Sequence, residues 1–361
     1  MKQDDYYDLK IILWLILFLV FGIIIITCKP VSGDYVMTVN GPVNPGELGI
    51  TLEHEHILVD FIGAGSIGYF RWNRDSVIEK VLPFVLEAKG KGVKSFIDCT
   101  PAFLGRDPWL LKEISRKTGM IFITNTGYYG SGKNKYIPDS FFNEDSETLA
   151  AKWFSEFQNG IETSGVKPGF IKIAVENDSV ISPDNRKIVI AAGLTHLKTG
   201  MVIASHTGPE QPAFGQIAIL RELGIDPSAF IWVHAQRGTM KGIIDAAQQG
   251  AWISLDNVGY RPSLEPGSTN SIEWYADRIS EMKKNGLLNK VLLSHDSGWY
   301  DPEKPGGGKL NNYTDIFDFL IPELEKREFT VSDIDQIMSK NPAEAFKIKI
   351  RKTSGILTFN F

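Results

Sequence analysis

The stretch that decides the fold is TLEHEHILVD, residues 51–60, an apolar run that carries two histidines. Further short runs rich in Val, Ile and Phe recur after it, each separated from the next by a stretch with helical periodicity. These runs occupy residues 94–100, 120–129, 169–176, 201–208, 230–236, 251–259 and 290–298. Alternating strands and helices form a parallel sheet, and eight such units favour an α/β fold of the (β/α)8 TIM-barrel type over an open doubly wound sheet.

The segments on either side of this repeat complete the predicted domain. Residues 35–50 contain YVMTVNG and a turn rich in Pro and Gly, which indicates an N-terminal β-hairpin that caps one end of the barrel. Residues 315–348 indicate C-terminal closing helices. No glycine-rich phosphate loop follows the first strand, which argues against a nucleotide-binding fold. We therefore assign residues 35–361 to one barrel.

The composition excludes some classes of partner. The chain has 361 residues, of which 43% are hydrophobic and 22% charged, as in an ordinary globular protein. A net charge of −5 without any Lys/Arg-rich block gives no footprint for nucleic acid. Two cysteines do not make a disulfide framework, and Cys99 is expected to be a buried strand residue.

The N-terminus differs from the rest because residues 11–27 (IILWLILFLVFGIIIIT) are an unbroken apolar run. Its length is at the short end of the roughly 17–25 residues that span a bilayer. The run ends just before Cys28 and resembles a bacterial lipoprotein signal with Cys28 as the lipidated residue. We predict that residues 1–28 are an export signal or a membrane anchor, followed by a linker at 29–34. Both predictions place the barrel in the periplasm or at the cell surface, attached to or released from a membrane.

Two histidines of the first predicted strand share one face. His54 and His56 are two positions apart, so both imidazoles point into the barrel, while Glu55 points the other way toward the helices. Two packed histidines are the plainer alternative for this pair taken alone.

Three further polar residues stand at the C-terminal ends of later predicted strands, where active sites of such barrels form. These are His206, His234 and Asp296. Neutral imidazole suits Zn²⁺ and related ions, and a carboxylate adds negative charge and a proton acceptor. Each could be an ordinary polar strand end, but their joint occurrence favours a divalent-metal hydrolase.

Lys172, in the strand GFIKIAVE, is the least expected member of this group. An ammonium group cannot bind a metal because it has no lone pair. A buried lysine can lose its proton, and the free amine can add CO₂ to become a carbamate, which is carboxylate-like and able to bridge two ions. From the residues alone, Lys172 is a buried strand lysine that requires an explanation.

These segments resemble the phosphotriesterase family of the amidohydrolase superfamily over roughly residues 35–350. The resemblance rests on GxTLEHEH, TPxxxGRD, TGYY, GFIK, SHTG, IWVHAQ, LDN and LLSHD. It implies two divalent metal ions, with Zn²⁺ expected first and Mn, Co or Fe also compatible with such ligands. The implied ligands are His54, His56 and Asp296 for one ion, His206 and His234 for the other, and Lys172 as a bridging carbamate. Homodimers are usual in the family, so a homodimer is expected.

The resemblance also implies a reaction, in which a hydroxide that bridges the metals attacks the substrate and Asp296 takes its proton. In the organophosphate-cleaving enzymes, a proton relay continues through a His and an Asp whose places here hold Asn257 and Arg237. Neither side chain titrates, and Asp256 is expected either to orient Asp296 or the rest of the site, or to be a structural carboxylate. We therefore expect a small-molecule lactone or carboxylic ester as substrate. Organophosphate or phosphoester hydrolysis is the alternative, and a surface-anchored binding protein without catalysis is a further one.

Several side chains near the strand ends are expected to contact the substrate. Tyr129 matches a position at which lactonase-like relatives place an aromatic residue beside the metals. Asn257, Arg237 and Trp299 complete the predicted substrate-binding set. Tyr69, Phe70 and Trp72 in the first loop are further candidates for a substrate cleft, with packing at the barrel rim as the alternative role.

Overall fold

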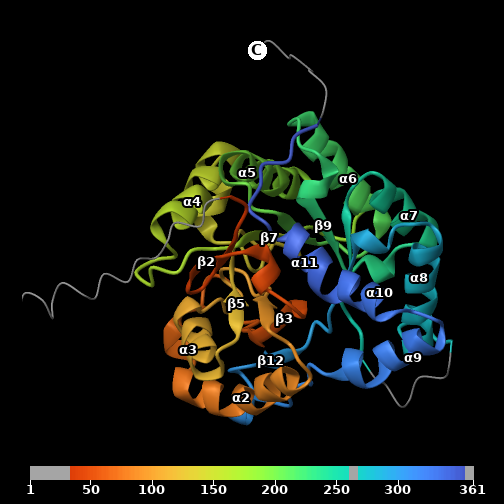
Figure 1. Ribbon diagram of the computed structural model, residues 1–361. Helices are drawn as coiled ribbons and strands as arrows, with labels where there is room; N and C mark the ends of the chain where they lie inside the picture. Colours follow the sequence, from red (N-terminus) through yellow and green to blue (C-terminus); the bar gives the residue numbers. More distant parts are fainter. Residues whose placement is uncertain (1–32, 260–266, 354–361) are drawn as a thin grey trace, which may run out of the picture. The chain divides into compact units, whose positions relative to one another are not determined.

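The structure, a computed structural model, describes residues 33–259 and 267–353 (Figure 1). The predicted export signal or anchor at residues 1–28, including Cys28, lies outside these ranges. Within them, no helix combines the length and the apolar character needed to cross a membrane. The predicted N-terminal hairpin is present, because β1 (Val36–Thr38) pairs antiparallel with β2 (Gly41–Val43). The Val39 amide also bonds the Phe122 carbonyl, which ties the hairpin to the barrel.

The predicted strands form a ring of parallel strands. Their bounds are β3 (Thr51–Leu58), β4 (Ser95–Asp98), β5 (Ile121–Ile123), β6 (Asn125–Thr126), β7 (Phe170–Ala174), β8 (Ile203–His206), β9 (Phe230–Val233), β10 (Trp252–Leu255), β11 (Val291–Leu293) and β12 (Gly298–Tyr300). They are arranged in the orders β12-β3-β4-β5 and β11-β10-β9-β8-β7-β6. The third predicted strand is split into β5 and β6, and the eighth continues into β12. The ring closes where the Asp296 amide bonds the His54 carbonyl at 3.1 Å. The fold is therefore a (β/α)8 barrel, as predicted.

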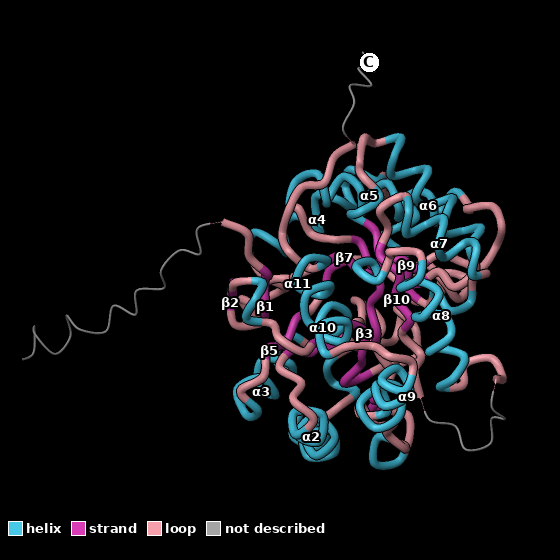
Figure 2. The backbone as a smooth tube through the Cα atoms, turned by 45° about the vertical axis from the view of Figure 1, so that its right-hand side comes forward, coloured by secondary structure: helices cyan, strands magenta, loops and turns pink. Residues whose placement is uncertain are grey.

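Helices cover the outside of the ring between successive strands (Figures 1 and 2). Their bounds are α2 (Arg74–Gly90), α3 (Pro108–Thr118), α4 (Ser146–Asn159), α5 (Pro183–Thr199), α6 (Glu210–Glu222), α7 (Met240–Gln248) and α8 (Ile272–Lys284). The closing helices are α9 (Ile321–Lys326), α10 (Val331–Asp335) and α11 (Asn341–Ala345), with π-helical turns at Ile316–Leu320 and Gln336–Lys340. At α3, Asp107 caps the Leu110 amide, Pro108 takes the first helical position, and Gly119 ends the helix in the left-handed conformation.

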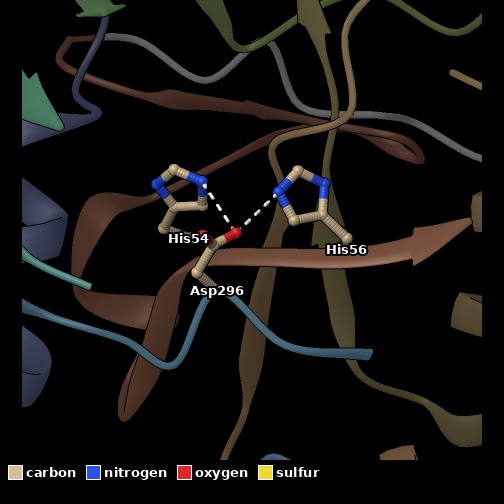
Figure 3. A group of neighbouring side chains, drawn as sticks. All are labelled: His54, His56 and Asp296. Carbon is tan, nitrogen blue, oxygen red and sulfur yellow. Dashed lines mark ion pairs between the residues drawn. The ribbon is translucent and has the colours of Figure 1, made fainter. Parts of the chain in front are cut away.

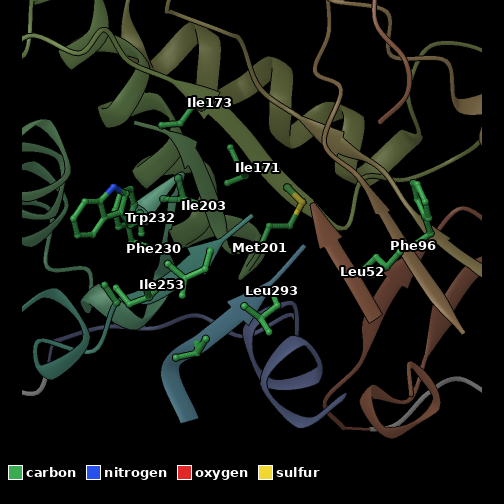
Figure 4. Packing of buried hydrophobic residues seen from close by; sticks show 14 of the residues in the cluster. Leu52, Phe96, Ile171, Ile173, Met201, Ile203, Phe230, Trp232, Ile253 and Leu293 are labelled. Carbon is green, nitrogen blue, oxygen red and sulfur yellow. The ribbon is translucent and has the colours of Figure 1, made fainter. Parts of the chain in front are cut away.

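Two apolar layers hold the barrel together. The larger layer lies between strands and helices and includes Leu52, Phe96 and Trp232 (Figure 4). The smaller layer fills the inside of the ring, where alternate residues of one strand point inward, as Ile231 and Val233 do in β9. Phe346, directly after α11, packs on Phe170 at 5.4 Å between ring centroids. Apolar packing therefore fills the amino-terminal end of the barrel, and polar side chains gather at the other end.

Candidate metal centre

A bulge in β3 places its polar side chains. The register between β3 and β4 shifts between Leu52 and Glu55, so β3 contains one residue more than the facing strand. Glu55 points away from the two histidines, as predicted, and accepts hydrogen bonds from the Ser294 hydroxyl at 2.7 Å and the Ser297 amide at 2.9 Å. His54 and His56 therefore both reach the carboxyl end of the barrel, on a strand that the hydrogen bonds of Glu55 hold in place on its opposite face.

His54, His56 and Asp296 converge on one point (Figure 3). One oxygen of Asp296 (Oδ1) lies 3.1 Å from His56 Nε2 and 3.6 Å from His54 Nε2. One potential ligand atom from each residue lies within 4.8 Å of the others, which is a spacing that a metal ion can bridge. Asp296 takes φ 52°, a left-handed conformation that is uncommon outside glycine and that occurs often at functional sites.

His206 and His234 form a second pair beside the first. Their rings are 4.4 Å apart between centroids, and His234 Nε2 lies 2.8 Å from His206 Nδ1. The ring of His234 lies 5.2 Å from that of His54, so the two groups are adjacent. His234 is also left-handed, with φ 60°. The four histidines predicted as ligands therefore meet at one end of the barrel.

Buried oxygen atoms lie beside the Nδ1 atoms of His54, His56 and His234, which leaves the Nε2 atoms of these rings toward the cavity. Asp256 lies between two of the histidines, with Oδ1 2.7 Å from His234 Nδ1 and Oδ2 3.2 Å from His54 Nδ1. The Thr100 hydroxyl lies 2.7 Å from His56 Nδ1, and it donates its own hydrogen to the Leu58 carbonyl. Thr100 therefore accepts a hydrogen bond from Nδ1, which leaves Nε2 with a lone pair for a metal. The sequence suggested Asp256 only as one of two alternatives, and it did not suggest Thr100.

Burial and neighbouring charge set the protonation of the site. Burial, followed by the charge of Lys172, lowers the pKa of His54 to about 4. Burial and His234 hold the pKa of His206 well below its usual range. Burial opposes ionisation of Asp256, but His234 and His54 outweigh it and keep the pKa of that carboxyl well below its usual range. His54 and His206 are therefore neutral, which is the form that binds metals.

Lys172 lies in β7 with its side chain inside the barrel. Its exposed fraction is 1%, and among the described residues its amine has no hydrogen-bond partner. The neighbouring chain is fitted closely to it, since a Cβ at Gly127 would lie 2.1 Å from the Lys172 carbonyl oxygen. A buried amine without a partner is costly, which indicates that a bound or attached group completes this site.

A cavity of about 60 Å³ opens between these groups. Six of its lining residues are the predicted ligands: His54, His56, Lys172, His206, His234 and Asp296. Tyr129 and Trp299 also border it, with ring centroids 5.0 Å from His206 and 5.7 Å from His56 respectively. Two of the four predicted substrate contacts therefore lie beside the predicted metal ligands.

Other residues lie elsewhere than the sequence suggested. Arg237 is exposed, with its guanidinium over Gly208, and Asn257 is half-buried; neither borders this cavity. Tyr69 and Trp72 line a different cavity of about 290 Å³ beside Arg106, and Phe70 is 85% exposed, so none of the three borders the metal cavity. Phe61 borders the metal cavity instead and packs on Trp299 at 5.6 Å between ring centroids. No periodic pattern in the sequence distinguished Phe61, which lines the cavity, from nearby aromatic residues that do not.

Glu53 and Ser254 form a second polar layer beneath the histidines. Both are fully buried, and the Ser254 hydroxyl contacts Glu53 and lies 2.7 Å from Asp256 Oδ2. Burial and the nearby Asp256 raise the pKa of Glu53 to about 8. Glu53 therefore carries a proton at neutral pH and can share a hydroxyl with an ionised Asp256.

A barrel whose strand ends bring together histidines, carboxylates and a buried lysine has the architecture of a metal-dependent hydrolase. The model of the Phosphotriesterase family matches residues 34–346, so the chain belongs to that family. It is 27% identical over 303 residues to the phosphotriesterase homology protein of Escherichia coli, with 83% of this chain and 98% of that protein covered. It is 28% identical over 311 residues to the aryldialkylphosphatase of Saccharolobus solfataricus, with 83% and 95% covered.

A solved structure shows the same fold. A variant of the PTE-like lactonase of Deinococcus radiodurans superposes with a TM-score of 0.76 at 25% identity, and the match covers 86% of this chain and 99% of that one. Because its relatives are hydrolases, the chain is a hydrolase of the metal-dependent type.

Proposed function

We propose that this protein hydrolyses lactones or carboxylic esters with the help of two divalent metal ions. The observation that carries this proposal is the single cavity of about 60 Å³ bordered by four histidines, Asp296 and the amine of Lys172. Binding of a small anion alone would not require neutral imidazoles. The free nitrogen of His56 and the low pKa of His54 and His206 suit metal ligation.

The donor set suits two ions, of which Zn²⁺ is the first candidate and Mn, Co and Fe are others. His54, His56 and Asp296 would hold one ion, and His206 and His234 the other. The amine of Lys172, which has no hydrogen-bond partner among the described residues, would supply a further anionic ligand after addition of CO₂ to form a carbamate. When bound, such ions lower the pKa of a water molecule and polarise the substrate oxygen.

The protein's own residues would do the remaining work. Asp296, held in a left-handed conformation beside His56, would accept the proton of the attacking water and pass it toward the leaving group. Asp256 would keep the rings of His54 and His234 in place through their Nδ1 atoms. Tyr129 and Trp299 would form the wall against which the organic part of the substrate packs.

The substrate preference rests on the relay positions. Arg237 and Asn257 cannot titrate, and neither borders the metal cavity, which supports a substrate that needs no extended proton relay. The PTE-like lactonase of D. radiodurans supports the same preference. Organophosphate or phosphoester hydrolysis is a second candidate, favoured by the similarity to the aryldialkylphosphatase.

A proton-release assay on the metal-loaded full chain in neutral detergent tests the proposal. The panel holds acyl-homoserine lactones, sugar lactones, aryl carboxylic esters and one aryl phosphotriester, with Asp296→Asn as the control. We expect turnover of a lactone or ester that depends on Asp296. Turnover of the phosphotriester alone would contradict the substrate class, and tight ligand binding without turnover would favour a non-catalytic binding protein.

We also propose that the protein is exported and held at a membrane by its N-terminus, through lipid on Cys28 or through the apolar run at residues 11–27. The barrel would then be in the periplasm or at the cell surface, as a homodimer. Incorporation of a labelled fatty acid that disappears in Cys28→Ser would identify the lipid form, and retention in membranes without label would identify the uncleaved anchor. Light scattering of the detergent-solubilised chain would test the dimer.

A further inference from the structure

A second and larger cavity, of about 450 Å³, lies at the end of the barrel opposite the metal centre. Asp226 and Ser228 precede β9, Trp252 begins β10, and Lys290 directly precedes β11, so these residues stand at the amino ends of the strands. Figure 1 shows α10 and α11 crossing the strands close to one another. The other wall comes from residues 336–352, which follow α10. This feature is referred to below as the amino-end cavity.

The amino-end cavity carries an excess of positive charge. Five cationic side chains border it, against the two carboxylates of Asp226 and Glu344. The cationic residues are Lys290, Lys340, Lys349, Arg351 and Lys352. The charge of Glu344 is already balanced by Lys347 at 2.7 Å, and Lys340 pairs with Asp335 at 2.9 Å. The cavity is therefore locally positive, although the net charge of the whole chain is −5.

Four of these cations lack a carboxylate partner among the described residues. Lys290 Nζ donates to the Gly250 carbonyl at 3.0 Å and lies 4.6 Å from the centroid of the Trp252 ring. The guanidinium of Arg351 donates only to backbone carbonyls, including that of Glu344 at 2.8 Å. Lys349 and Lys352 are exposed and form no ion pair there. Unpaired cations around one hollow attract a ligand with a phosphate or another multivalent anion.

The start of the barrel lies beside this cavity. Asp34 pairs with Lys347 at 3.0 Å, and the Ile348 amide bonds the Tyr35 carbonyl at 2.8 Å. Six residues separate Asp34 from Thr27, the last residue of the apolar run, so the connection can span at most about 25 Å when fully extended. An anchor formed by this run would therefore be attached to the barrel through Asp34, the residue that pairs with Lys347 beside the amino-end cavity.

We propose that the amino-end cavity and its rim of Lys349, Ile350 and Lys352 bind the headgroups of anionic phospholipids. This inference rests on the membrane attachment proposed above. A polybasic surface next to a membrane anchor gains affinity for anionic lipid from each lysine near the bilayer surface. Ile350, which is 46% exposed, adds an apolar contact between two lysines. The metal centre, at the opposite end of the barrel, then faces away from the bilayer.

Lysine footprinting on the full chain tests this orientation. The chain is incorporated into vesicles of phosphatidylcholine alone or of phosphatidylcholine mixed with phosphatidylglycerol, and acylation rates of single lysines are measured by mass spectrometry. We expect Lys349 and Lys352 to react at least about fivefold more slowly on the anionic vesicles. The exposed lysines Lys112 and Lys241, which lie near the starts of α3 and α7, should keep their rates and serve as internal controls.

A matched pair of variants sharpens the test. Lys349→Glu/Lys352→Glu should abolish the slower acylation of Lys340 on anionic vesicles, whereas Lys112→Glu/Lys241→Glu, with the same change in net charge, should retain it. Equal rates on both kinds of vesicle overturn the proposal while leaving membrane attachment intact. A chain that fails to enter either vesicle overturns both. Slower acylation in inorganic phosphate without vesicles, equal to that on anionic lipid, assigns the cavity to a soluble phosphate instead.

Discussion

The two ends of the barrel are built from the same strands but in opposite ways. At the carboxyl end, β8 ends on His206, while His234 and Asp296 follow β9 and β11 in left-handed conformations around a buried lysine without a partner. At the amino end, apolar side chains fill the ring and Phe346 packs against them. The comparison indicates that the amino end contributes the stability that the carboxyl end requires for its unfavourable polar groups.

The largest expected effect is at the carboxyl end. Asp296→Asn removes the proton acceptor, so kcat/KM should fall by about 10²–10⁴-fold, because general base catalysis contributes that much. The melting temperature should not fall, since a half-buried polar group held in a strained conformation contributes little to stability. Activity assays and thermal unfolding check this, with Asp245→Asn on the surface of α7 as the control. Unchanged turnover by the metal-loaded variant would remove Asp296 from the mechanism.

The next effect separates metal binding from chemistry. Asp256→Asn removes the carboxylate charge that lies beside the Nδ1 atoms of His54 and His234, and metal affinity should weaken by about 10–100-fold. Titration with a competing chelator measures the affinity, and excess metal should restore part of the activity. Equal affinity in the variant and the wild type would mean that Asp256 has only a structural role.

At the amino end, we expect a substitution to lower stability and to leave activity unchanged. Arg351→Met removes hydrogen bonds from a buried guanidinium to the Glu344 and Ala345 carbonyls and should lower the free energy of unfolding by about 3 kcal/mol. Turnover per folded molecule at low temperature should be unchanged. Arg116→Met on the exposed face of α3 is the control and should cost less than about 1 kcal/mol. Loss of bound metal in Arg351→Met would break the distinction between the two ends.

The smallest effect depends on pH. His196, in the last turn of α5, bonds the Met201 carbonyl at 2.8 Å and the Arg351 amide at 3.0 Å, and burial lowers its pKa. Because the unfolded chain then binds this proton more readily, stability is complete above the ordinary histidine pKa of about 6.5 and decreases as the pH falls below it. Between pH 7.5 and 5.5 the loss should be about 1 kcal/mol. His196→Gln should be less stable overall but should show a flatter pH dependence, and an equal slope in both proteins would argue against this role.

Much of the fold could be predicted because strand and helix periods are local properties. The runs rich in Val, Ile and Phe became the strands, and Asp107-Pro108 became the cap and first turn of α3. The break between β5 and β6 could not be predicted, nor could β12 as a separate strand. Both depend on which neighbour each backbone group pairs with, which is decided by contacts distant in the sequence.

The candidate site was predictable in its ligands but not in its supports. His206, His234 and Asp296 could be selected because each stands at the end of an apolar run, and the structure brings them together with His54, His56 and Lys172. No local signal predicted the bulge in β3, the contact of Asp256 with two histidines or the position of Phe61 in the cavity wall. The amino-end cavity was also invisible, since its walls come from residues 226 to 352.

The sequence by itself determined the eight-unit barrel, the set of candidate ligand residues and the apolar N-terminal run, because hydrophobic period and residue type act over a few neighbouring positions. The tertiary structure alone decided which nitrogen of His56 faces the cavity. Within residues 33–259 and 267–353, it also left the Lys172 amine without a hydrogen-bond partner and brought together, at the opposite end, four cations that have no carboxylate partner. These features arise from the closure of the ring, which sets distances between side chains that no spacing along the chain specifies.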